Sequence, residues 1–333
     1  MSTFIIAEAG VNHNGDFDTA IELIKVAKDS GADAVKFQTF KAKDLVTPGV
    51  GLADYQGKQL PLVSTQYEML ENLELSHADF AKLKAYADLI GIEFLSTGFN
   101  VDDIEYLMRL GMKKIKIPSG EITNKDLLDF VGRTECEVIL SSGMSTGEEI
   151  EQALFLLSPK GVGDKNITVL HCNSQYPAPF EEINLRSIPY LKARFGYNTG
   201  YSDHTLGIEA AIAAIALGAT MIEKHFTLDT KMVGPDHAAS INPDGLKALV
   251  SASRNIEVAL GINGKFPSRG EQLTKQFARR FIVAKRQIKK GEKISIDDIA
   301  FKRCGFGLSP MNVEEILDTS AIRDFATNEA IEK

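Results

Sequence analysis

Short apolar runs alternate with helix-like segments from residue 4 to residue 260, and this alternation constrains the fold more than any other feature. Ala20, Leu23, Ile24 and Ala27 recur at helical spacing, and Gly31 ends that helix. Similar helical patterns cover 146–157, 208–217 and 245–260. Eight runs have the length and character of buried strands: Phe4–Ala7, Ala34–Phe37, Glu93–Ser96, Lys114–Ile117, Val138–Ser141, Thr168–His171, Tyr197–Ser202 and Thr220–Glu223.

Eight strand–helix units of this total length predict an α/β fold of the (β/α)8 TIM-barrel type. A doubly wound open sheet is the competing fold, but it needs fewer strands, and no glycine-rich dinucleotide turn follows the first one. We place the barrel at 1–265 and a linker, rich in Gly, Pro and charge, at 266–278. Residues 279–333 form a small β-rich domain with strand-like runs at 281–284 and 299–302.

Composition narrows the class of protein. The 333 residues are 44% hydrophobic and 25% charged, as in ordinary globular proteins, and the net charge of -8 disfavours nucleic acid and anionic lipid as partners. Cys136, Cys172 and Cys304 are too widely spaced for a disulfide framework, which indicates a reducing, cytoplasmic location. The uncharged stretch 210–222 is too short to span a membrane. The N-terminal segment has no basic region typical of a signal peptide.

Polar residues gather where the predicted strands end, which is where barrel enzymes carry their active sites. Strand ends without a function would show turn residues and few charges. The residues at these positions are Glu8, Asn12, His13, Lys36, Gln38, Thr97, Lys116, Ser119, Glu121, Ser141, Asn173, Ser202, His204 and His225.

His204 and His225 each close one of two successive strands, so the barrel would bring their imidazoles together. Two neutral imidazoles suit a divalent metal such as Mn2+ or Zn2+, with water and substrate at the open positions. The alternative is that each histidine only orients a hydrogen bond. The residues alone leave these two interpretations about equal.

Two lysines and four hydroxyl groups at separate strand ends would complement a phosphate or carboxylate. They are Lys36, Thr97, Lys116, Ser119, Ser141 and Ser202. A lysine could instead form a Schiff base, as in barrel aldolases. We favour anion binding, because two lysines inside strands need compensating charge.

Two acids could perform acid–base chemistry or bind a polyol: Glu8 and Glu121. Each could instead pair with Lys36 or Lys116. Asp236, in the turn after the eighth strand, could bind a sugar hydroxyl or cap the turn.

Ten short motifs, in order along the chain, resemble those of the bacterial sialic acid synthase family. Each motif alone is weak, but ten in register are specific, and they cover nearly the whole chain. They are AEAGVNHNG (7–15), KFQTF (36–40), STGF (96–99), KIPSGE (116–121), SSGMST (141–146), HCNSQYPAP (171–179), GYSDHTLG (200–207), EKHFTLD (223–229), GPDHAAS (234–240) and KRCGFG (302–307).

The resemblance implies a TIM barrel followed by a C-terminal antifreeze-like (SAF) domain, in a domain-swapped homodimer. It also implies condensation of phosphoenolpyruvate with an N-acylated mannosamine-type sugar, with release of phosphate. The implied metal is Mn2+, with Mg2+ or Co2+ as alternatives, held by His204 and His225. Phosphoenolpyruvate would be bound by positions matching Lys36, Thr97, Lys116, Ser119, Ser141 and Ser202. The sugar would be contacted by positions matching Gln38, Glu121, Tyr176, Asp236, Phe277 and, from the partner subunit, Arg303.

The chain departs from the family pattern at two of its motifs. Cys304 stands in the string Lys-Arg-Cys-Gly, where the family usually has proline. Ser174, near the sugar position, stands where some members carry asparagine.

The first functional prediction is therefore an N-acetylneuraminate synthase that uses N-acetylmannosamine. The alternative within the family is an N,N'-diacetyllegionaminate synthase that uses 2,4-diacetamido-2,4,6-trideoxy-mannose. Outside the family, a Schiff-base aldolase and an ice- or carbohydrate-binding protein are the competing interpretations. The polar strand ends of the barrel argue against a binding protein without catalysis.

Overall fold

Eight parallel strands close into a barrel in the computed structural model, which describes residues 2–60, 62–163 and 165–333. The strands pair in sequence order, and the last pairs with the first. This confirms the predicted TIM-type barrel. The strands are β1 (Phe4–Gly10), β2 (Ala34–Thr39), β3 (Glu93–Gly98), β4 (Lys114–Ile117), β5 (Glu137–Ser141), β6 (Ile167–Cys172), β7 (Asn198–Asp203) and β8 (Met221–His225).

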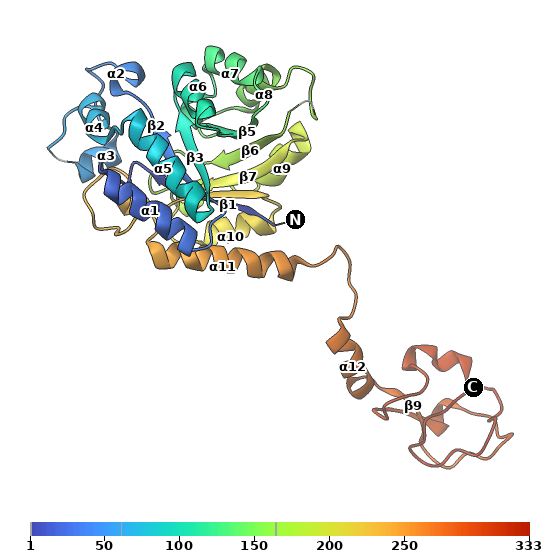
Figure 1. The fold of residues 1–333 in the computed structure, drawn as a ribbon. Helices are drawn as coiled ribbons and strands as arrows, with labels where there is room; N and C mark the ends of the chain where they lie inside the picture. Colours follow the sequence, from blue (N-terminus) through green and yellow to red (C-terminus); the bar gives the residue numbers. More distant parts are fainter. Residues whose placement is uncertain (1, 61, 164) are drawn as a thin grey trace. The chain divides into compact units, whose positions relative to one another are not determined.

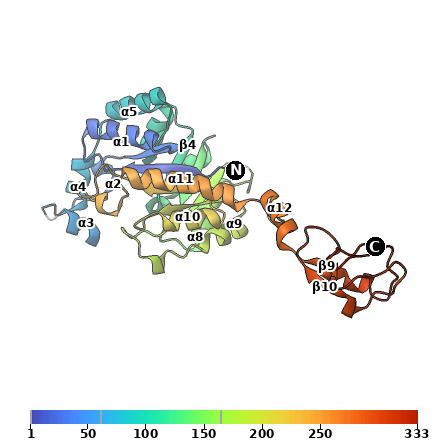
Figure 2. The same ribbon diagram turned by 90° about the horizontal axis from the view of Figure 1, so that it is seen from below.

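Helices surround the strands on the outside of the barrel (Figures 1 and 2). They bury their apolar faces against the outer face of the sheet, so that Ile5 and Val35 of the strands share one core cluster with Leu23, Leu83 and Leu249 of the helices. The barrel helices are α1 (Phe17–Asp29), α5 (His77–Ile90), α6 (Val101–Arg109), α7 (Lys125–Gly132), α8 (Gly147–Leu157), α9 (Ser187–Phe195), α10 (Glu209–Ala216) and α11 (Pro243–Leu260).

Local sequence signals set the helix boundaries. The Asp16 side chain caps α1 by accepting from the backbone N–H of Thr19, and Asn242 caps α11, which begins at Pro243. Gly91 ends α5 in the left-handed conformation that glycine adopts without a steric cost. The hydrophobic pattern places these helices, and the caps fix their ends.

One connection is longer than the rest and carries extra helices. Between β2 and α5 lie α2 (Ala42–Leu45), α3 (Asp54–Gln59) and α4 (Gln66–Leu73). They have their own small apolar cluster, which includes Val11, Phe40, Met69 and Leu73. Because this segment follows the carboxyl end of β2, it lies at the end of the barrel where TIM-barrel active sites form. Short 3-10 turns follow β4 (η1, Ser119–Glu121), β6 (η2, Phe180–Glu182) and β8 (η3, His237–Ala239).

The chain divides into two units, Met1–Gly261 and Ile262–Lys333. The second unit begins with α12 (Arg269–Ala278), which lies within the segment expected to be a linker and has no buried residue. Two antiparallel strands follow, β9 (Phe281–Ala284) and β10 (Ile299–Lys302), with η4 (Ile296–Asp298) and η5 (Pro310–Glu315). Apolar residues including Ile282, Ile294 and Phe325 form a separate core for this small β-rich unit.

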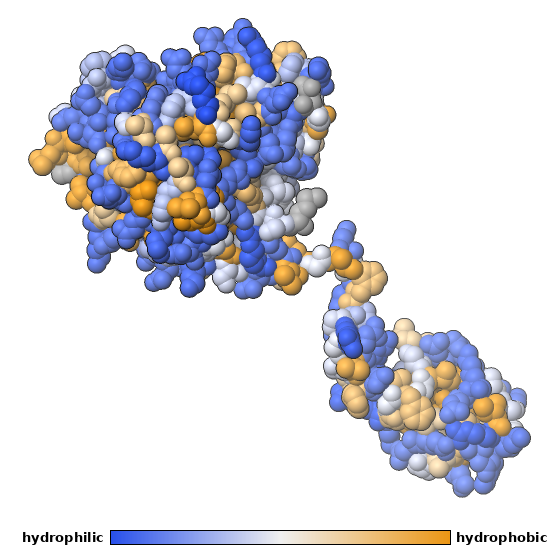
Figure 3. Space-filling model, in the orientation of Figure 1, coloured by the Kyte–Doolittle hydropathy of each residue, from blue (hydrophilic) through white to orange (hydrophobic). Residues whose placement is uncertain are grey.

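Hydrophilic residues cover most of the barrel face drawn in Figure 3, and apolar residues appear there singly or in small groups. Among residues 2–60, 62–163 and 165–333, no helix has both the length and the apolar character needed to cross a bilayer.

Candidate active site

A small cavity of about 70 Å³ lies at the carboxyl ends of the barrel strands. It brings together eleven of the predicted site residues, which come from all eight barrel strands or the loops that follow them. Four further residues line it that were not predicted as site residues: Phe99, Pro118, Cys172 and Glu223. The predicted residues that line it are Glu8, Lys36, Gln38, Thr97, Lys116, Ser119, Ser141, Tyr176, Ser202, His204 and His225.

Strand register explains why residues so distant in sequence meet here. Glu8 of β1 pairs in register with Lys36 of β2 on one side and with His225 of β8 on the other. Thr97 is in register with Lys116, and Ser202 with Glu223. Because paired residues of neighbouring strands point to the same face, these side chains all enter the barrel interior.

Four charged side chains form the base of the cavity, and each is almost fully buried. Lys36 Nζ lies 2.8 Å from Glu8 Oε2 and 3.6 Å from Glu223 Oε2. Lys116 Nζ lies 3.4 Å from Glu223 Oε1, which also accepts a hydrogen bond from Ser202 Oγ at 3.1 Å. We call Glu8, Lys36, Lys116 and Glu223 the charge quartet.

The two acids of the quartet differ in proton affinity. Burial raises the pKa of Glu8 to about 7, although Lys36 opposes this shift. Burial also acts to raise the pKa of Glu223, but Lys116 and Lys36 outweigh it and lower that pKa to about 2. Glu223 is therefore the permanent counter-ion of the lysines, and Glu8 is the acid that exchanges a proton near neutral pH.

The pKa values of the two lysines are also shifted in opposite directions. Burial lowers the pKa of Lys116, and the charge of Lys36 adds to the effect. Burial acts in the same direction on Lys36, but Glu223 and Glu8 outweigh it and raise the pKa of that ammonium group. Since an unneutralised ammonium is costly to bury, an anion in the cavity would stabilise the charged form of Lys116.

Hydroxyl groups extend this positive site. Lys36 Nζ donates to Thr97 Oγ1 at 3.0 Å, and the backbone N–H of Gly143 donates to Ser119 Oγ at 3.0 Å. The Ser141 hydroxyl is buried without a hydrogen-bond partner among the residues that the structure describes. Buried polar groups are normally satisfied, so this hydroxyl indicates a place for a bound polar molecule.

The two histidines lie on the other side of the cavity, with ring centroids 5.6 Å apart. His204 Nδ1 donates to the carbonyl oxygen of Asn173 at 2.5 Å, because a carbonyl can only accept. This fixes the tautomer and leaves the lone pair on Nε2, which lies 3.4 Å from the Ser202 hydroxyl oxygen. His225 Nδ1 is buried, with no hydrogen-bond partner in the described part of the chain.

Both imidazoles are neutral at physiological pH. Burial lowers the pKa of His204 to about 4. Burial also lowers the pKa of His225 well below its usual value, and the neighbouring His204 adds to this. Neutral imidazoles with free lone pairs suit a divalent metal, so the residues present fit the ion that the sequence predicts. Within the described ranges no three His, Cys, Asp or Glu side chains cluster as ligands, so the chain would supply two.

A buried ion pair on the outer face of the sheet supports both histidines. Lys224 Nζ lies 2.8 Å from Asp203 Oδ2, and both side chains are fully buried. Lys224 also donates to the carbonyl oxygen of Thr205 at 2.5 Å, while Asp203 Oδ1 accepts from the Thr205 backbone. Since Asp203 and Lys224 directly precede His204 and His225, this pair links the two segments that carry the imidazoles.

Aromatic rings form the wall above the histidines. The Tyr176 ring stacks on His204 with centroids 4.1 Å apart, and Tyr55 of α3 stacks on Tyr176 at 5.3 Å. Asp236 Oδ2 lies 4.0 Å from His225 Nδ1, and burial raises the pKa of Asp236 to about 6. Burial and the Asp236 charge together raise the pKa of Tyr55. This side of the cavity offers stacking surfaces and one buried carboxyl group.

Other predicted site residues lie outside the cavity lining. Glu121 is in η1 and accepts a hydrogen bond from Asn124 Nδ2 at 2.6 Å. Ser174 lies close to the cavity lining. A Cβ atom added to Gly143 would be 2.3 Å from Ser174 Oγ and 2.8 Å from Ser119 Oγ, and Ser119 lines the cavity. Phe277 of α12 and Arg303, which follows β10, belong to the second unit, where both side chains are exposed.

Sequence reasoning missed Glu223 and Tyr55. Glu223 lies two residues before His225 on the same strand, so the alternation of side chains could have identified it as inward-facing. Tyr55 lies in the long connection after β2, where no periodic pattern indicates which residues approach the barrel.

Comparison with known proteins matches both parts of the chain to families. Residues 23–265 match the NeuB family, and residues 279–333 match the SAF domain. An N,N'-diacetyllegionaminic acid synthase from Campylobacter jejuni is 46% identical over 329 residues, 99% of this chain and 98% of the relative. A synthase of the same name from Legionella pneumophila is also 46% identical, over 95% of this chain and 90% of its own length.

A solved structure supports the fold. The N-acetylneuraminic acid (sialic acid) synthetase of Leptospira borgpetersenii superposes with a TM-score of 0.73 and is 33% identical. The match covers 82% of this chain and 90% of that protein. The homologues are sugar acid synthases, so this chain is an enzyme of that kind.

The neutrality of His204 makes a prediction for the metal-free protein. We expect His204 to stay neutral and protonated on Nδ1 down to about pH 4. The unfolded chain takes up its proton near pH 6.5, so this group lowers the free energy of unfolding as the pH falls from 6.5 towards 4. Nitrogen NMR of 15N-histidine-labelled protein would detect the tautomer and the titration. A His204 that titrates at or above pH 6.5 would contradict this description of the site.

Proposed function

Because the chain belongs to the NeuB family, a family of sialic-acid-type synthases, we propose that it is an N,N'-diacetyllegionaminic acid synthase. The reaction joins phosphoenolpyruvate to 2,4-diacetamido-2,4,6-trideoxy-mannose and releases phosphate. This is the alternative of the two functions that the sequence predicts.

One observation carries this choice of product. Two relatives that bear this name are 46% identical over nearly the whole chain. The N-acetylneuraminic acid synthetase is 33% identical over a smaller share. The comparisons thus support the diacetamido sugar better than N-acetylmannosamine, which was the first prediction.

The charge quartet supports phosphoenolpyruvate as the anionic substrate. Lys36 and Lys116 would bind its phosphate and carboxylate groups, with Glu223 holding both ammonium groups in place. Hydroxyl groups would complete the cradle: Thr97, Ser119, Ser141 and Ser202. These donors are fixed in the barrel before substrate binds, which favours electrostatic stabilisation of the reacting anion.

His204 and His225 would hold the divalent ion, with Mn2+ as the expected metal and Mg2+ or Co2+ as alternatives. When bound, such an ion supplies Lewis-acid polarisation of the open-chain sugar aldehyde. The hydrogen bond from His204 to Asn173 holds that imidazole in the tautomer that can bind a metal.

The reaction requires a base as well as an electrophile. C3 of phosphoenolpyruvate attacks the aldehyde carbon, so that the C=C and C=O π bonds break and the new C–C bond forms. The aldehyde oxygen takes up a proton and becomes a hydroxyl group, and C2 is left with positive charge. Water then adds at C2, and the C–O bond to phosphate breaks. We assign Glu8 as the base that takes the proton of this water, because Glu8 lines the cavity and burial raises its pKa to about 7. Glu121 lies outside the cavity lining and is the weaker candidate.

The sugar would bind on the side of the cavity that carries Tyr176 and Asp236. Gln38 lines the cavity, and Ser174 and Glu121 lie close to the strand ends. Phe277 is expected to contact the sugar as well, and Arg303 is expected to reach it from the partner subunit of a domain-swapped homodimer. We propose the homodimer from the family resemblance and a cytoplasmic location from the spacing of the three cysteines.

Phosphate release from phosphoenolpyruvate tests the function. With Mn2+, we expect kcat/KM to be at least about 10-fold higher for 2,4-diacetamido-2,4,6-trideoxy-mannose than for N-acetylmannosamine, the size of effect that one or two buried groups produce. EDTA should abolish turnover, and added Mn2+ should restore it. Preference for N-acetylmannosamine would instead support the first prediction, an N-acetylneuraminate synthase. Activity after EDTA treatment would exclude a required metal ion.

Glu8→Gln tests the assignment of the base. The wild-type kcat/KM should rise with pH through about 7, as the Glu8 carboxyl group ionises. The variant should lose about 10²- to 10⁴-fold in kcat and also lose this rise. Glu93→Gln, at the other end of the barrel strands, is the control and should keep both the rate and the pH profile. An unchanged pH profile in Glu8→Gln would show that another group is the base.

A further inference from the structure

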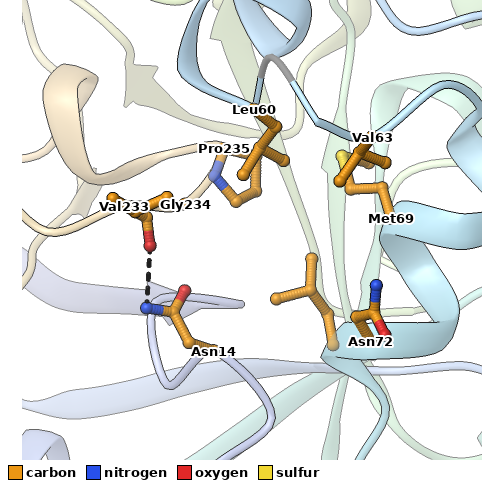
Figure 4. Close-up of a pocket in the computed structure, with 9 residues that line it drawn as sticks. Asn14, Leu60, Val63, Met69, Asn72, Val233, Gly234 and Pro235 are labelled. Carbon is orange, nitrogen blue, oxygen red and sulfur yellow. Dashed lines mark hydrogen bonds between the residues drawn. The ribbon is translucent and has the colours of Figure 1, made fainter.

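A second pocket, of about 200 Å³, lies at the same end of the barrel as the active-site cavity (Figure 4). Its lining is mostly apolar, so we call it the apolar pocket. Three segments contribute to it, namely the loop after β1, the long connection after β2 and the loop after β8. The residues that line it include Asn14, Leu60, Val63, Met69, Asn72 and Pro235.

Hydrogen bonds fix the loops of this pocket. Asn14 Nδ2 donates to the carbonyl oxygen of Val233 at 3.0 Å, and Asn14 Oδ1 lies 3.1 Å from His237 Nε2. Figure 4 shows the first of these bonds beside the pocket, with Leu60 and Pro235 facing it from above. The loop after β1 and the loop after β8 are therefore held together at the pocket wall.

The apolar pocket and the active-site cavity have no lining residue in common, but two short segments connect them. Pro235 lines the pocket, and the next residue, Asp236, has its carboxylate 4.0 Å from His225 Nδ1. Leu60 lines the pocket at the end of α3, while Tyr55 near the start of the same helix stacks on Tyr176 in the cavity. The pocket thus lies beyond Asp236 and α3, on the side where the sugar is expected to extend.

The two candidate sugars differ only at C4 and C6. Relative to N-acetylmannosamine, the diacetamido sugar carries an acetamido group in place of the C4 hydroxyl and a methyl group in place of the C6 hydroxymethyl. Each change removes a hydroxyl group and introduces a methyl group. An apolar pocket favours methyl groups and disfavours a hydroxyl group that it cannot hydrogen-bond.

We propose that the apolar pocket is the subsite that selects the sugar, by accepting the C6 methyl group and the 4-acetamido group of 2,4-diacetamido-2,4,6-trideoxy-mannose. This inference rests on the proposed function. Val63, Met69 and Pro235 provide the apolar contacts. Asn14 and Asn72 provide amide groups at the edge, where the 4-acetamido group needs hydrogen bonds.

Val63→Phe tests the subsite, because it fills the pocket from a half-buried loop position. The readout is the ratio of kcat/KM for the diacetamido sugar to kcat/KM for N-acetylmannosamine. We expect Val63→Phe to lower this ratio at least about 10-fold, mainly through KM of the diacetamido sugar. Leu62→Phe adds the same ring in the same segment at a position that is 94% exposed, and it should leave the ratio unchanged.

Val63→Thr keeps the inference testable if the larger side chain disturbs folding, which thermal melting would reveal. It keeps the branched shape, places a hydroxyl group in the pocket, and should lower the ratio in the same direction by a smaller factor. Equal losses for both sugars, or an unchanged ratio in both Val63 variants, would overturn the subsite while leaving the proposed function intact. A wild-type enzyme that does not prefer the diacetamido sugar would overturn the proposed function itself, and the subsite with it.

Discussion

The ion pairs among Glu8, Lys36, Lys116 and Glu223 are the interactions on which the rest of the site depends. Moving one charge from water into a protein interior costs several kcal/mol, so a barrel can hold two lysines at its centre only with compensating acids and well-placed partners. Glu223 is within 3.6 Å of Lys36 and 3.4 Å of Lys116 and remains ionised. Glu8 exchanges its proton near neutral pH. The quartet is therefore stable without substrate, yet it can adjust its charge when an anion arrives.

The other residues of the cavity suit different ligands. The hydroxyl groups beside the lysines suit an anion, and the paired imidazoles suit a metal ion. On the remaining side, Tyr55, Tyr176 and Asp236 offer surfaces suited to a sugar. The buried Asp203–Lys224 pair lies behind the histidines and holds their backbone segments together. Each chemical requirement of a condensation between an anion and an aldehyde thus has its own group of residues, placed by strand register for the charged groups and by the loops after the strands for the sugar side.

Much of the fold could be predicted from the sequence, because eight apolar runs with intervening helical patterns suit few architectures. The positions of His204, His225, Lys36 and Lys116 followed from the same pattern, since strand ends converge in a closed barrel. Tyr55 could not be predicted, because it reaches the site from a long connection whose path depends on tertiary packing. The sugar could not be fixed either, because the proposed subsite is built from three segments that are distant in sequence, and its shape depends on their tertiary packing.

The most direct test of the central role of the quartet is the affinity for phosphoenolpyruvate, measured by calorimetry. We predict that Lys116→Met weakens binding about 10- to 100-fold, as expected for the loss of a charge-assisted hydrogen bond. Lys114→Met is the matched control, because Lys114 lies two residues earlier on β4, where it pairs with Glu93. It should change the affinity less than about twofold, within the usual effect of a substitution away from the site. Equal affinities for the wild type and Lys116→Met would contradict the assignment of the buried charges to anion binding.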